Sequence, residues 1–456
     1  MNEKTKIFSI PVLDKYILYA PLKQLAMVVN NALLTRVAKQ LDFPEERIDE
    51  DSELFLLLKN MGLFDPDPVL FSGCNCIQPF RPSQVILMLT TGCNLACTYC
   101  YAARDKSRPV FIKWPVAKKA IDIAFENSRS VKGGAFSLSF HGGGEPTLAR
   151  SLFFQTIEYA RSLDPNCRIA VTTNAVWDSD FRDRALDLLN EISISLDGNE
   201  LTQNRQRPDK HGRGTFLAVM ETIAEIEKRS LNYGIRVTCT KESLSELSGN
   251  VKFLCENTTC RTFQVEPVYN QGRAEGKGMT IDDVSSFVEA FMDAYYLANS
   301  KGKNLYYSGA RPHVRTLTFC RATSDVLIVT ANGELTACYE VFDRSHVLSD
   351  DFIIGKIDLE KGIILTPGKR EALFGKIEEN RARCEGCFCY FHCAGDCPPK
   401  AFIANLHDDE FRCSVAREIT KELILERIAS SNGVWQGGLS NRIGQSVYQT
   451  IESKKK

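Results

Sequence analysis

Residues 85–101 read VILMLTTGCNLACTYCY, an apolar run followed closely by Cys93, Cys97 and Cys100. The β-branched, apolar run predicts a buried strand, so the three thiols stand just past its carboxyl end. Iron–sulfur clusters are usually held by four cysteines, and a zinc site built on Cys-x2-Cys expects a second ligand pair about 12 to 20 residues further on. The next cysteine is Cys167. Three thiolates at this spacing can hold three irons of a cubane cluster and leave the fourth iron open.

The middle of the chain repeats a strand followed by a helix. Parallel pairing through right-handed crossovers follows from such a repeat. It predicts an α/β fold with a partial (β/α)6 TIM-like barrel, whose functional groups gather at the carboxyl ends of the strands. Strands are predicted at residues 85–90, 136–140, 168–172, 192–196, 234–238 and 262–266, with amphipathic helices at 116–127, 151–163, 181–189, 216–229 and 244–257.

Polar residues follow the later strands. The second strand leads into His141-Gly-Gly-Gly-Glu-Pro-Thr147, where glycines let the backbone approach a ligand and Glu145 can accept a hydrogen bond from an ammonium group. Asn174 and Ser195 stand at the ends of the third and fourth strands. His141 is equally well explained as a packing or supporting histidine and as a catalytic one.

The Cys-x3-Cys-x2-Cys spacing, with Tyr99 before the last cysteine, closely resembles the radical S-adenosylmethionine (SAM) superfamily. The resemblance implies that the three cysteines bind a 4Fe-4S cluster whose open iron is chelated by the methionine group of SAM. It implies that the Gly-Gly-Glu run grips the SAM amino group and that Arg207 pairs with the carboxylate, although Arg207 could also be a surface charge. The SAM-binding residues expected on this resemblance are Tyr99, Gly143, Gly144, Glu145, Asn174, Ser195 and Arg207.

Seven more cysteines match the signature of the SPASM extension found in several peptide-modifying radical SAM families. They imply two auxiliary 4Fe-4S clusters, which makes three clusters in all. A zinc ribbon remains the alternative for the Cys384-x2-Cys387 pair. Gly333, which lies between two of the signature cysteines, suits a tight turn between strands predicted at 326–330 and 335–339. One auxiliary cluster would use Cys384, Cys387, Cys393 and Cys413, and the other Cys320, Cys338 and Cys397.

The second auxiliary cluster has only three signature ligands, because Val314 stands where some relatives have a cysteine. Its fourth iron would be capped by Cys389, by another residue or by a substrate thiol, and a buried free thiol is the plainer explanation of Cys389. Cys74 and Cys76 are either ordinary loop cysteines or a ligand or substrate relay. The remaining cysteines, Cys167, Cys239, Cys255 and Cys260, are expected in the core or at the surface.

The first eighty residues precede the barrel. Strands predicted at 8–12, 15–19 and 25–29, with helices at 32–40 and 52–61, resemble the winged-helix-like element with which peptide-modifying radical SAM enzymes bind a precursor's leader as an added strand. A structural cap on the barrel is the alternative. The predicted domains are a recognition domain at 1–80, a radical SAM core at 81–305, a SPASM domain at 306–420 and a helical tail at 421–456.

Composition bears on location and partners. A net charge of −1 over 456 residues gives no support for a nucleic-acid partner. The polar N-terminus predicts no signal peptide, and no apolar run is long enough to span a membrane. Seventeen cysteines in a chain expected in the cytoplasm indicate metal binding rather than disulfides.

The resemblance implies an oxidoreductase that cleaves SAM reductively to a 5′-deoxyadenosyl radical. That radical would modify or crosslink a ribosomally made precursor peptide, by a thioether or carbon–carbon bond, with electrons from a flavodoxin- or ferredoxin-type donor. A formylglycine-forming sulfatase maturase is the alternative within the class, and a non-catalytic iron–sulfur or zinc scaffold that binds peptides is the alternative outside it. No residue is assigned as catalytic.

Overall fold

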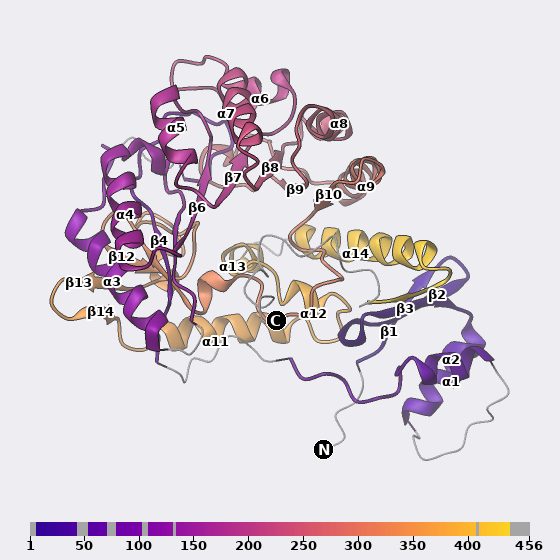
Figure 1. Cartoon of the computed structure of the whole chain (residues 1–456). Helices are drawn as coiled ribbons and strands as arrows, with labels where there is room; N and C mark the ends of the chain where they lie inside the picture. The colour runs from indigo at the N-terminus through magenta and orange to yellow at the C-terminus, as the bar shows by residue number, and fades with distance from the viewer. Residues whose placement is uncertain are drawn as a thin grey trace. The chain divides into compact units, whose positions relative to one another are not determined.

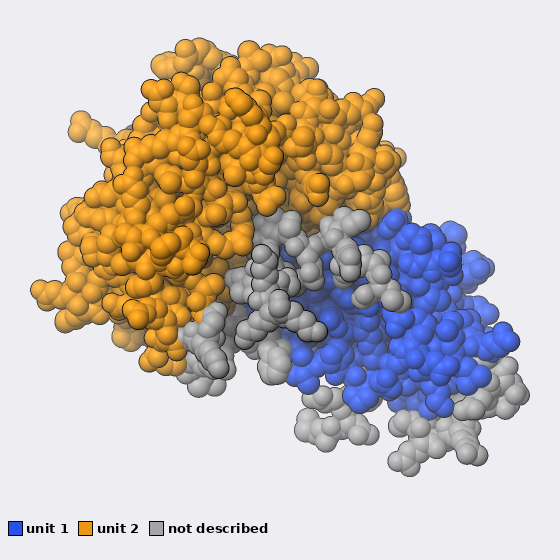
Figure 2. Space-filling view, viewed as in Figure 1, with its two compact units in different colours: residues 1–72, 309–319, 380–456 blue, residues 73–308, 320–379 orange. Residues whose placement is uncertain are grey.

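A computed structural model describes residues 6–42, 53–70, 79–102, 108–130, 134–406 and 410–437 (Figure 1). The chain divides into two compact units, coloured separately in Figure 2. Unit 1 comprises residues 1–72, 309–319 and 380–456, and unit 2 comprises residues 73–308 and 320–379. The predicted cysteine-rich segment 306–420 therefore contributes to both units.

Unit 2 is built on a sheet whose described strands run in the order β10-β9-β8-β7-β6-β5-β4-β11-β12-β13-β14. Neighbours from β4 to β9 pair in parallel, which confirms the parallel α/β sheet. A further parallel strand, β10 (Asn304–Tyr306), was not predicted and lies beside β9. The predicted strands are β4 (Gln84–Leu87), β5 (Ser137–Phe140), β6 (Arg168–Thr173), β7 (Glu191–Ser195), β8 (Tyr233–Cys239) and β9 (Thr262–Pro267).

Helices connect these strands because each has one apolar stripe that the sheet can bury. In α3 the stripe is Ala117, Ala120, Ile121 and Ala124, spaced three or four residues apart and buried. Sequence reasoning missed the short α6 and the long α9. The helices are α3 (Trp114–Ser130), α4 (Arg150–Leu163), α5 (Ser179–Leu186), α6 (Glu200–Gln206), α7 (Phe216–Lys228), α8 (Leu247–Asn257) and α9 (Val284–Ser300).

The sheet continues beyond β4. Strand β11 (Val326–Val329) pairs in parallel with β4, and β12 (Glu334–Thr336) turns back antiparallel to β11. Gly333 makes this turn with a φ of 80°, as predicted. β13 (Ile353–Asp358) and β14 (Gly362–Leu365) complete the sheet, with α10 (Ser349–Phe352) before β13 and α11 (Lys369–Ala382) after β14.

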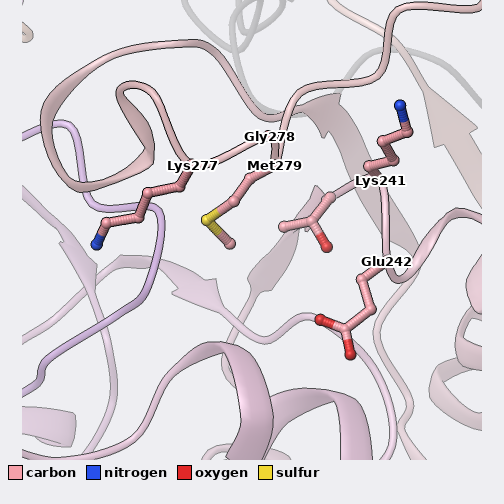
Figure 3. A pocket seen from close by; sticks show the side chains of 6 residues that line it. Lys241, Glu242, Lys277, Gly278 and Met279 are labelled. Atoms are coloured by element: carbon pink, nitrogen blue, oxygen red, sulfur yellow. The ribbon is translucent and has the colours of Figure 1, made fainter.

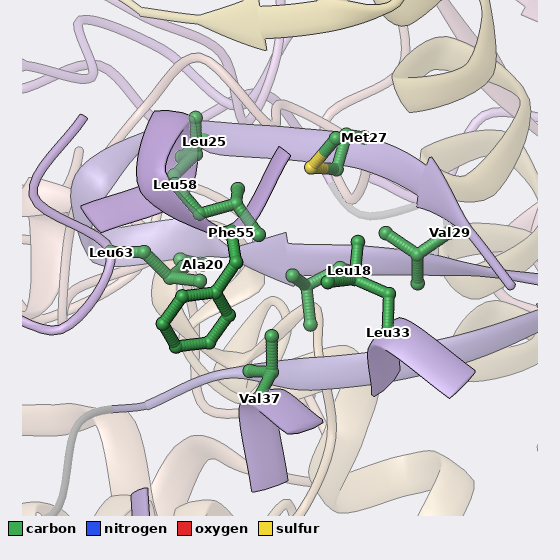
Figure 4. Packing of buried hydrophobic residues seen from close by; sticks show 10 residues of the cluster. All are labelled: Leu18, Ala20, Leu25, Met27, Val29, Leu33, Val37, Phe55, Leu58 and Leu63. Carbon is green, nitrogen blue, oxygen red and sulfur yellow. The ribbon is translucent and has the colours of Figure 1, made fainter. Parts of the chain in front are cut away.

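Unit 1 contains a sheet of order β1-β2-β3-β15 among its described strands. Strands β1 (Phe8–Val12), β2 (Lys15–Ala20) and β3 (Leu25–Val29) form as predicted, followed by α1 (Asn31–Asp42) and α2 (Glu53–Asn60). One face packs against these helices through Leu18, Met27 and Phe55 (Figure 4). The other unit 1 helices are α12 (Tyr390–Cys393), α13 (Pro398–Leu406) and α14 (Phe411–Ser430).

The opposite face of this sheet packs against α14 through Tyr19, Ile424 and Ile428. After α14 the chain forms strand β15 (Val434–Gln436), so the predicted tail 421–456 is not helical throughout. No helix in the described ranges is long and apolar enough to cross a membrane.

Candidate functional site

The loop after β4 carries the three cysteines. Cys97 is buried, and Cys93 and Cys100 are half-buried. Burial, together with the Glu145 carboxylate and the charges of Cys97 and Cys100, raises the pKa of the Cys93 thiol to about 12. The three thiols therefore lie close enough together for the charge of one to raise the pKa of another. A bound metal centre supplies the positive charge that lets such thiols ionise.

The Gly-Gly-Glu loop after β5 lies directly against this cysteine loop. The backbone N–H of Glu145 donates to the carbonyl oxygen of Gly92 at 2.7 Å. A Cβ atom at Gly144 would stand 1.9 Å from that oxygen, so only glycine fits there. A Cβ at Gly143 would come within 2.8 Å of the Phe342 ring.

The Glu145 carboxylate joins the ends of β5 and β6. It is 3% exposed and accepts hydrogen bonds from Thr147 Oγ1 at 2.8 Å, Thr173 Oγ1 at 2.7 Å and the backbone N–H of Asn174 at 2.8 Å. Burial raises the pKa of this carboxyl group, and the hydrogen bonds oppose the rise. The Asn174 side chain in turn donates to Cys93 Sγ at 3.8 Å, which places it beside the cysteine loop.

Arg207 is buried, so it is not the surface charge weighed as its alternative. Its guanidinium donates to the Tyr99 hydroxyl at 2.6 Å, and that hydroxyl donates to Asp197 Oδ2 at 2.5 Å. Asp197 also accepts from Gln206 Nε2 at 2.8 Å and from the backbone N–H of Thr238 at 3.0 Å. Neither Asp197 nor Gln206 is among the SAM-binding residues that we expected from the sequence, although Asp197 belongs to the polar stretch that follows β7.

Within the described residues, Nε of Arg207 is buried and makes no hydrogen bond. A buried guanidinium donor fits an anionic group such as a carboxylate. This donor, the close packing of the Gly144 loop on the cysteine loop and the three thiols fit a SAM-binding iron–sulfur cluster.

Ser195 is half-buried at the end of β7, opposite Arg236 of β8 in the strand register. His141 stacks on Tyr339, with ring centroids 4.5 Å apart, and its Nδ1 accepts from the backbone N–H of Gly142. Burial and the charge of Arg236 lower the pKa of His141 to about 4. His141 is therefore neutral near pH 7 and packs against an aromatic ring, as the packing interpretation expects.

A hollow of about 280 Å³ lies at the carboxyl end of β8 (Figure 3). Thr240 connects it to the buried network, because its hydroxyl donates to Gln206 Oε1 at 2.8 Å and Gln206 donates to Asp197. The hollow is lined by Thr240, Lys241, Glu242, Lys277, Gly278 and Met279.

Unit 2 also holds Cys320 and Cys338, two of the predicted auxiliary ligands. Cys338 is buried just after β12, and its pKa rises to about 12 through burial and the nearby Glu340, with a smaller effect of Cys320. Cys320 and Tyr101, the residue that follows Cys100, both pack against the hydrophobic cluster that includes Ile86.

Unit 1 brings together Cys384, Cys387, Cys393 and Cys413. Burial, together with the charges of Cys387 and Cys413, raises the pKa of Cys384 to about 11. Burial raises the pKa of Cys393 as well, and the charges of Asp396, Cys413 and Cys384 contribute to the rise. These four predicted ligands of one auxiliary cluster are therefore neighbours, and Cys397 lies in the same unit.

A buried ion pair fixes Cys413 beside the cysteine loop. Arg412, at the start of α14, donates to Asp396 Oδ1 at 2.5 Å, and both side chains are nearly buried. Asp396 has a φ of 72° and lies between Cys393 and Cys397 in the sequence. The pair explains how α14 and a distant loop contribute thiols to one cluster of side chains.

The structure gives Cys389 a position in unit 1 next to Cys387. The Cys389 thiol is 2% exposed and donates to the Ala416 carbonyl at 3.7 Å and to Cys387, which lowers the pKa of Cys387 to about 6. Cys74 and Cys76 lie outside the described residues. Cys167, Cys239, Cys255 and Cys260 are buried, as the core interpretation expects.

Among the described residues, no three His, Cys, Asp or Glu side chains are grouped as a site for a metal ion. A cubane cluster is larger than one ion and spreads its ligating sulfurs over its corners. The neighbouring thiols of unit 1 are compatible with that wider arrangement.

The sheet, its cysteine loop and the adjoining Gly-Gly-Glu loop define an α/β enzyme with a thiol-rich site at the carboxyl ends of parallel strands. Residues 87–254 match the model of the radical SAM superfamily. These residues form a radical SAM domain, so the chain is an enzyme, and the domain implies one 4Fe-4S cluster and bound SAM. A non-catalytic scaffold is thereby set aside.

Several of the relatives are named as maturation enzymes. The chain is 25% identical to the serine-type anaerobic sulfatase-maturating enzyme of Klebsiella aerogenes over 69% of this chain and 79% of that protein. It is also 25% identical to the sporulation killing factor maturation protein SkfB of Bacillus subtilis over 63% and 67% of the two chains. The Streptococcus suis SuiB structure, bound to its precursor peptide SuiA, has the same fold with a TM-score of 0.51, 15% identity and coverage of 86% and 94%.

Proposed function

We propose that this enzyme matures a ribosomally made precursor peptide by an oxidative modification or crosslink. The observation that carries the proposal is unit 1, in which a small sheet and four neighbouring cysteines accompany the radical SAM core. The likeness to SkfB, named as a maturation protein for a sporulation killing factor, supports a maturation reaction.

When bound, the cluster and SAM supply a 5′-deoxyadenosyl radical. Cys93, Cys97 and Cys100 hold this group, and the packing of Gly144 on Gly92 fixes their loop relative to β5. Arg207 orients an anionic end of SAM, because its buried Nε still has a hydrogen bond to give. Tyr99 and Asp197 hold the guanidinium in place. Burial at the strand ends keeps water from the reacting atoms.

The remaining cysteines extend the proposal to two auxiliary 4Fe-4S clusters in a SPASM domain. Cys384, Cys387, Cys393 and Cys413 are ligands of one, and Cys320, Cys338 and Cys397 of the other. Held by these cysteines, such clusters would supply an electron acceptor for an oxidative reaction or a binding point for the substrate. A flavodoxin- or ferredoxin-type protein in the cytoplasm is the proposed electron donor.

Unit 1 is the proposed docking element for the leader of the precursor peptide. Its three N-terminal strands and two helices have the order expected of a winged-helix-like recognition domain. Docking by strand addition to a sheet edge gives affinity through the backbone and selectivity through alternate side chains.

A second candidate function, formation of formylglycine in a sulfatase, is favoured by the extent of the match to the Klebsiella maturase. Anaerobically reconstituted enzyme is tested first for release of 5′-deoxyadenosine from SAM under strong reductant. It is then offered any short peptide that a neighbouring gene encodes and, separately, a sulfatase peptide carrying the target serine.

A mass change in the gene-neighbour peptide supports peptide maturation. Oxidation of the sulfatase serine alone would replace the proposal with the sulfatase function. Absence of SAM cleavage by fully reconstituted enzyme would contradict both. Enzyme prepared without iron serves as the control.

A further inference from the structure

Strand β15 closes one edge of the unit 1 sheet, and it comes from the opposite end of the chain to the strand it joins. It pairs antiparallel with β3, so that Trp435 stands opposite Ala26. The pairing continues at Gly437, whose backbone N–H donates to the Gln24 carbonyl at 2.7 Å. An extended segment bound to a sheet edge through its backbone is the arrangement by which many domains recognise peptides.

A single aromatic side chain anchors this strand. Trp435 is 2% exposed and lies in the cluster that includes Ile17 and Ile424. Its ring stacks on Tyr19, with centroids 6.3 Å apart, and the Arg427 guanidinium lies 5.1 Å from its centroid. The edge of β3 therefore offers a pocket for one large aromatic residue alongside backbone hydrogen bonds.

β15 pairs with only part of the β3 edge. β3 has five residues, Leu25–Val29, and β15 pairs with the first three of them. Val28 and Val29 extend past β15, with no strand beside them on that edge among the described residues. A longer extended segment could make every pair that β15 makes and add pairs with these two residues.

The opposite edge of the sheet is less suited to an added strand. β1 and β2 are joined by a two-residue turn in which Val12 pairs with Lys15 and Pro11 with Tyr16. The two residues that flank such a turn, Val12 and Lys15, hydrogen-bond to each other through their backbones. Backbone groups alternate in direction along a strand, so those of Pro11 point to the open edge of the sheet. Proline has no N–H to donate, so this edge can form fewer hydrogen bonds with an added strand.

We propose that the β3 edge is the docking site for an extended peptide segment with a large aromatic side chain. In the free enzyme β15 binds this edge, and the substrate segment must displace β15 in order to dock. The proposal rests on the peptide-maturing function proposed above. It adds the position of the docking edge, the aromatic anchor of the ligand and the segment of the enzyme that competes with it.

The test uses the full-length, reconstituted chain and a fluorescent peptide with the sequence of residues 431–437, SNGVWQG. Trp435→Ala frees the edge, Trp435→Leu is a milder variant that keeps the core filled, and Trp435→Phe is the matched control that keeps an aromatic anchor. Fluorescence anisotropy measures binding, and thermal unfolding establishes that each variant is folded.

We expect the peptide to bind Trp435→Ala about ten-fold or more tightly than the wild type, because β15 no longer holds the edge. Trp435→Leu should lie between them and Trp435→Phe should resemble the wild type. A peptide with alanine in place of its tryptophan should not bind. A peptide with Thr-Val in place of Asn-Gly should bind more tightly, through pairs with Val28 and Val29.

Equal binding to wild type and the folded variants would overturn the proposal, as would the absence of binding to a folded Trp435→Ala or Trp435→Leu chain. These outcomes leave SAM cleavage untouched as a separate measurement. Failure of the docking proposal is thus distinguishable from failure of the proposed function, which is judged by 5′-deoxyadenosine release and peptide modification in the wild type.

Discussion

The backbone of Glu145 is hydrogen-bonded to that of Gly92, N–H to carbonyl oxygen, at 2.7 Å. This bond joins the loop after β5 to the loop that carries Cys93. The two loops form one structure at the carboxyl ends of neighbouring parallel strands. The position of the cysteines consequently depends on a residue about fifty positions away in the sequence.

Gly144→Ala should disrupt this contact, since the new Cβ would stand 1.9 Å from the Gly92 oxygen. The loop carrying Cys93 must then shift. A displacement of about 1 Å at a reacting group costs about 100-fold in rate, so we expect a loss of that order in SAM cleavage. Gly375→Ala in α11 is the control, because nothing lies within 4 Å of the added atom. Equal 5′-deoxyadenosine release by both variants would argue against the packing role.

Tyr99→Phe removes a hydroxyl that accepts from Arg207 and donates to Asp197. Asp197 keeps its bonds from Gln206 and Thr238, so the fold should survive. A hydrogen bond to a charged group contributes about 1.5–3 kcal/mol, and we expect roughly ten-fold or more weaker SAM binding with unchanged iron content. Tyr159→Phe, which also loses a hydroxyl contact to an aspartate, should bind SAM normally. SAM affinity equal to wild type in Tyr99→Phe would count against the positioning role.

The barrel strands could be predicted because each is a short β-branched run between clear helical patterns. The strands from β4 to β9 begin within about two residues of the predicted positions, and Gly333 makes the expected turn. The same reasoning located the cysteine loop, since residues after a buried strand must emerge at the sheet edge.

The rest depends on contacts that local patterns do not encode. β10 and β15 have three residues each, too few for a period-two pattern to stand out. The pairing of β11 with β4 and of β15 with β3 joins segments hundreds of residues apart. The Tyr99–Asp197–Arg207 network likewise brings together groups from three separate loops, and only their placement after strands could have suggested it.

Replacing Cys93, Cys97 and Cys100 together with alanine should abolish SAM cleavage and remove one cluster. If the chain holds three clusters, iron content falls by about a third, because each cubane contains four irons. Cys255→Ala, which changes a buried thiol in α8, is the control and should keep full iron and activity. Unchanged iron in the triple variant would show that the triad holds no cluster.

Docking of a precursor peptide is better tested by point substitution than by removing the N-terminal domain. A chain beginning near Pro79 would lose Ile17, Tyr19 and Ala26, leaving Ile424 and Ile428 of α14 exposed to water. We expect such a truncation to lower the thermal unfolding temperature as well as peptide processing. A truncated chain with wild-type stability and wild-type turnover of the full precursor would contradict leader docking by unit 1.

The cluster assigned to Cys320, Cys338 and Cys397 should have one iron without a cysteine ligand from the signature. Cys389 is placed beside Cys387, to which it donates a hydrogen bond, so we expect Cys389→Ala to alter the spectrum or potential of the Cys384-containing cluster instead. Thiolates are strong ligands for iron, and a substrate peptide carrying a cysteine should then change the spectrum of the open cluster directly.

The comparison that decides this is electron paramagnetic resonance of the wild type and Cys389→Ala, each with a cysteine peptide and with its serine analogue. A change with the cysteine peptide alone, in both proteins, supports ligation by the substrate. Loss of a cluster in Cys389→Ala without any peptide would identify Cys389 as the missing ligand. If neither peptide nor the substitution changes the spectrum, all four irons of the cluster have protein ligands and the cluster serves only to carry electrons.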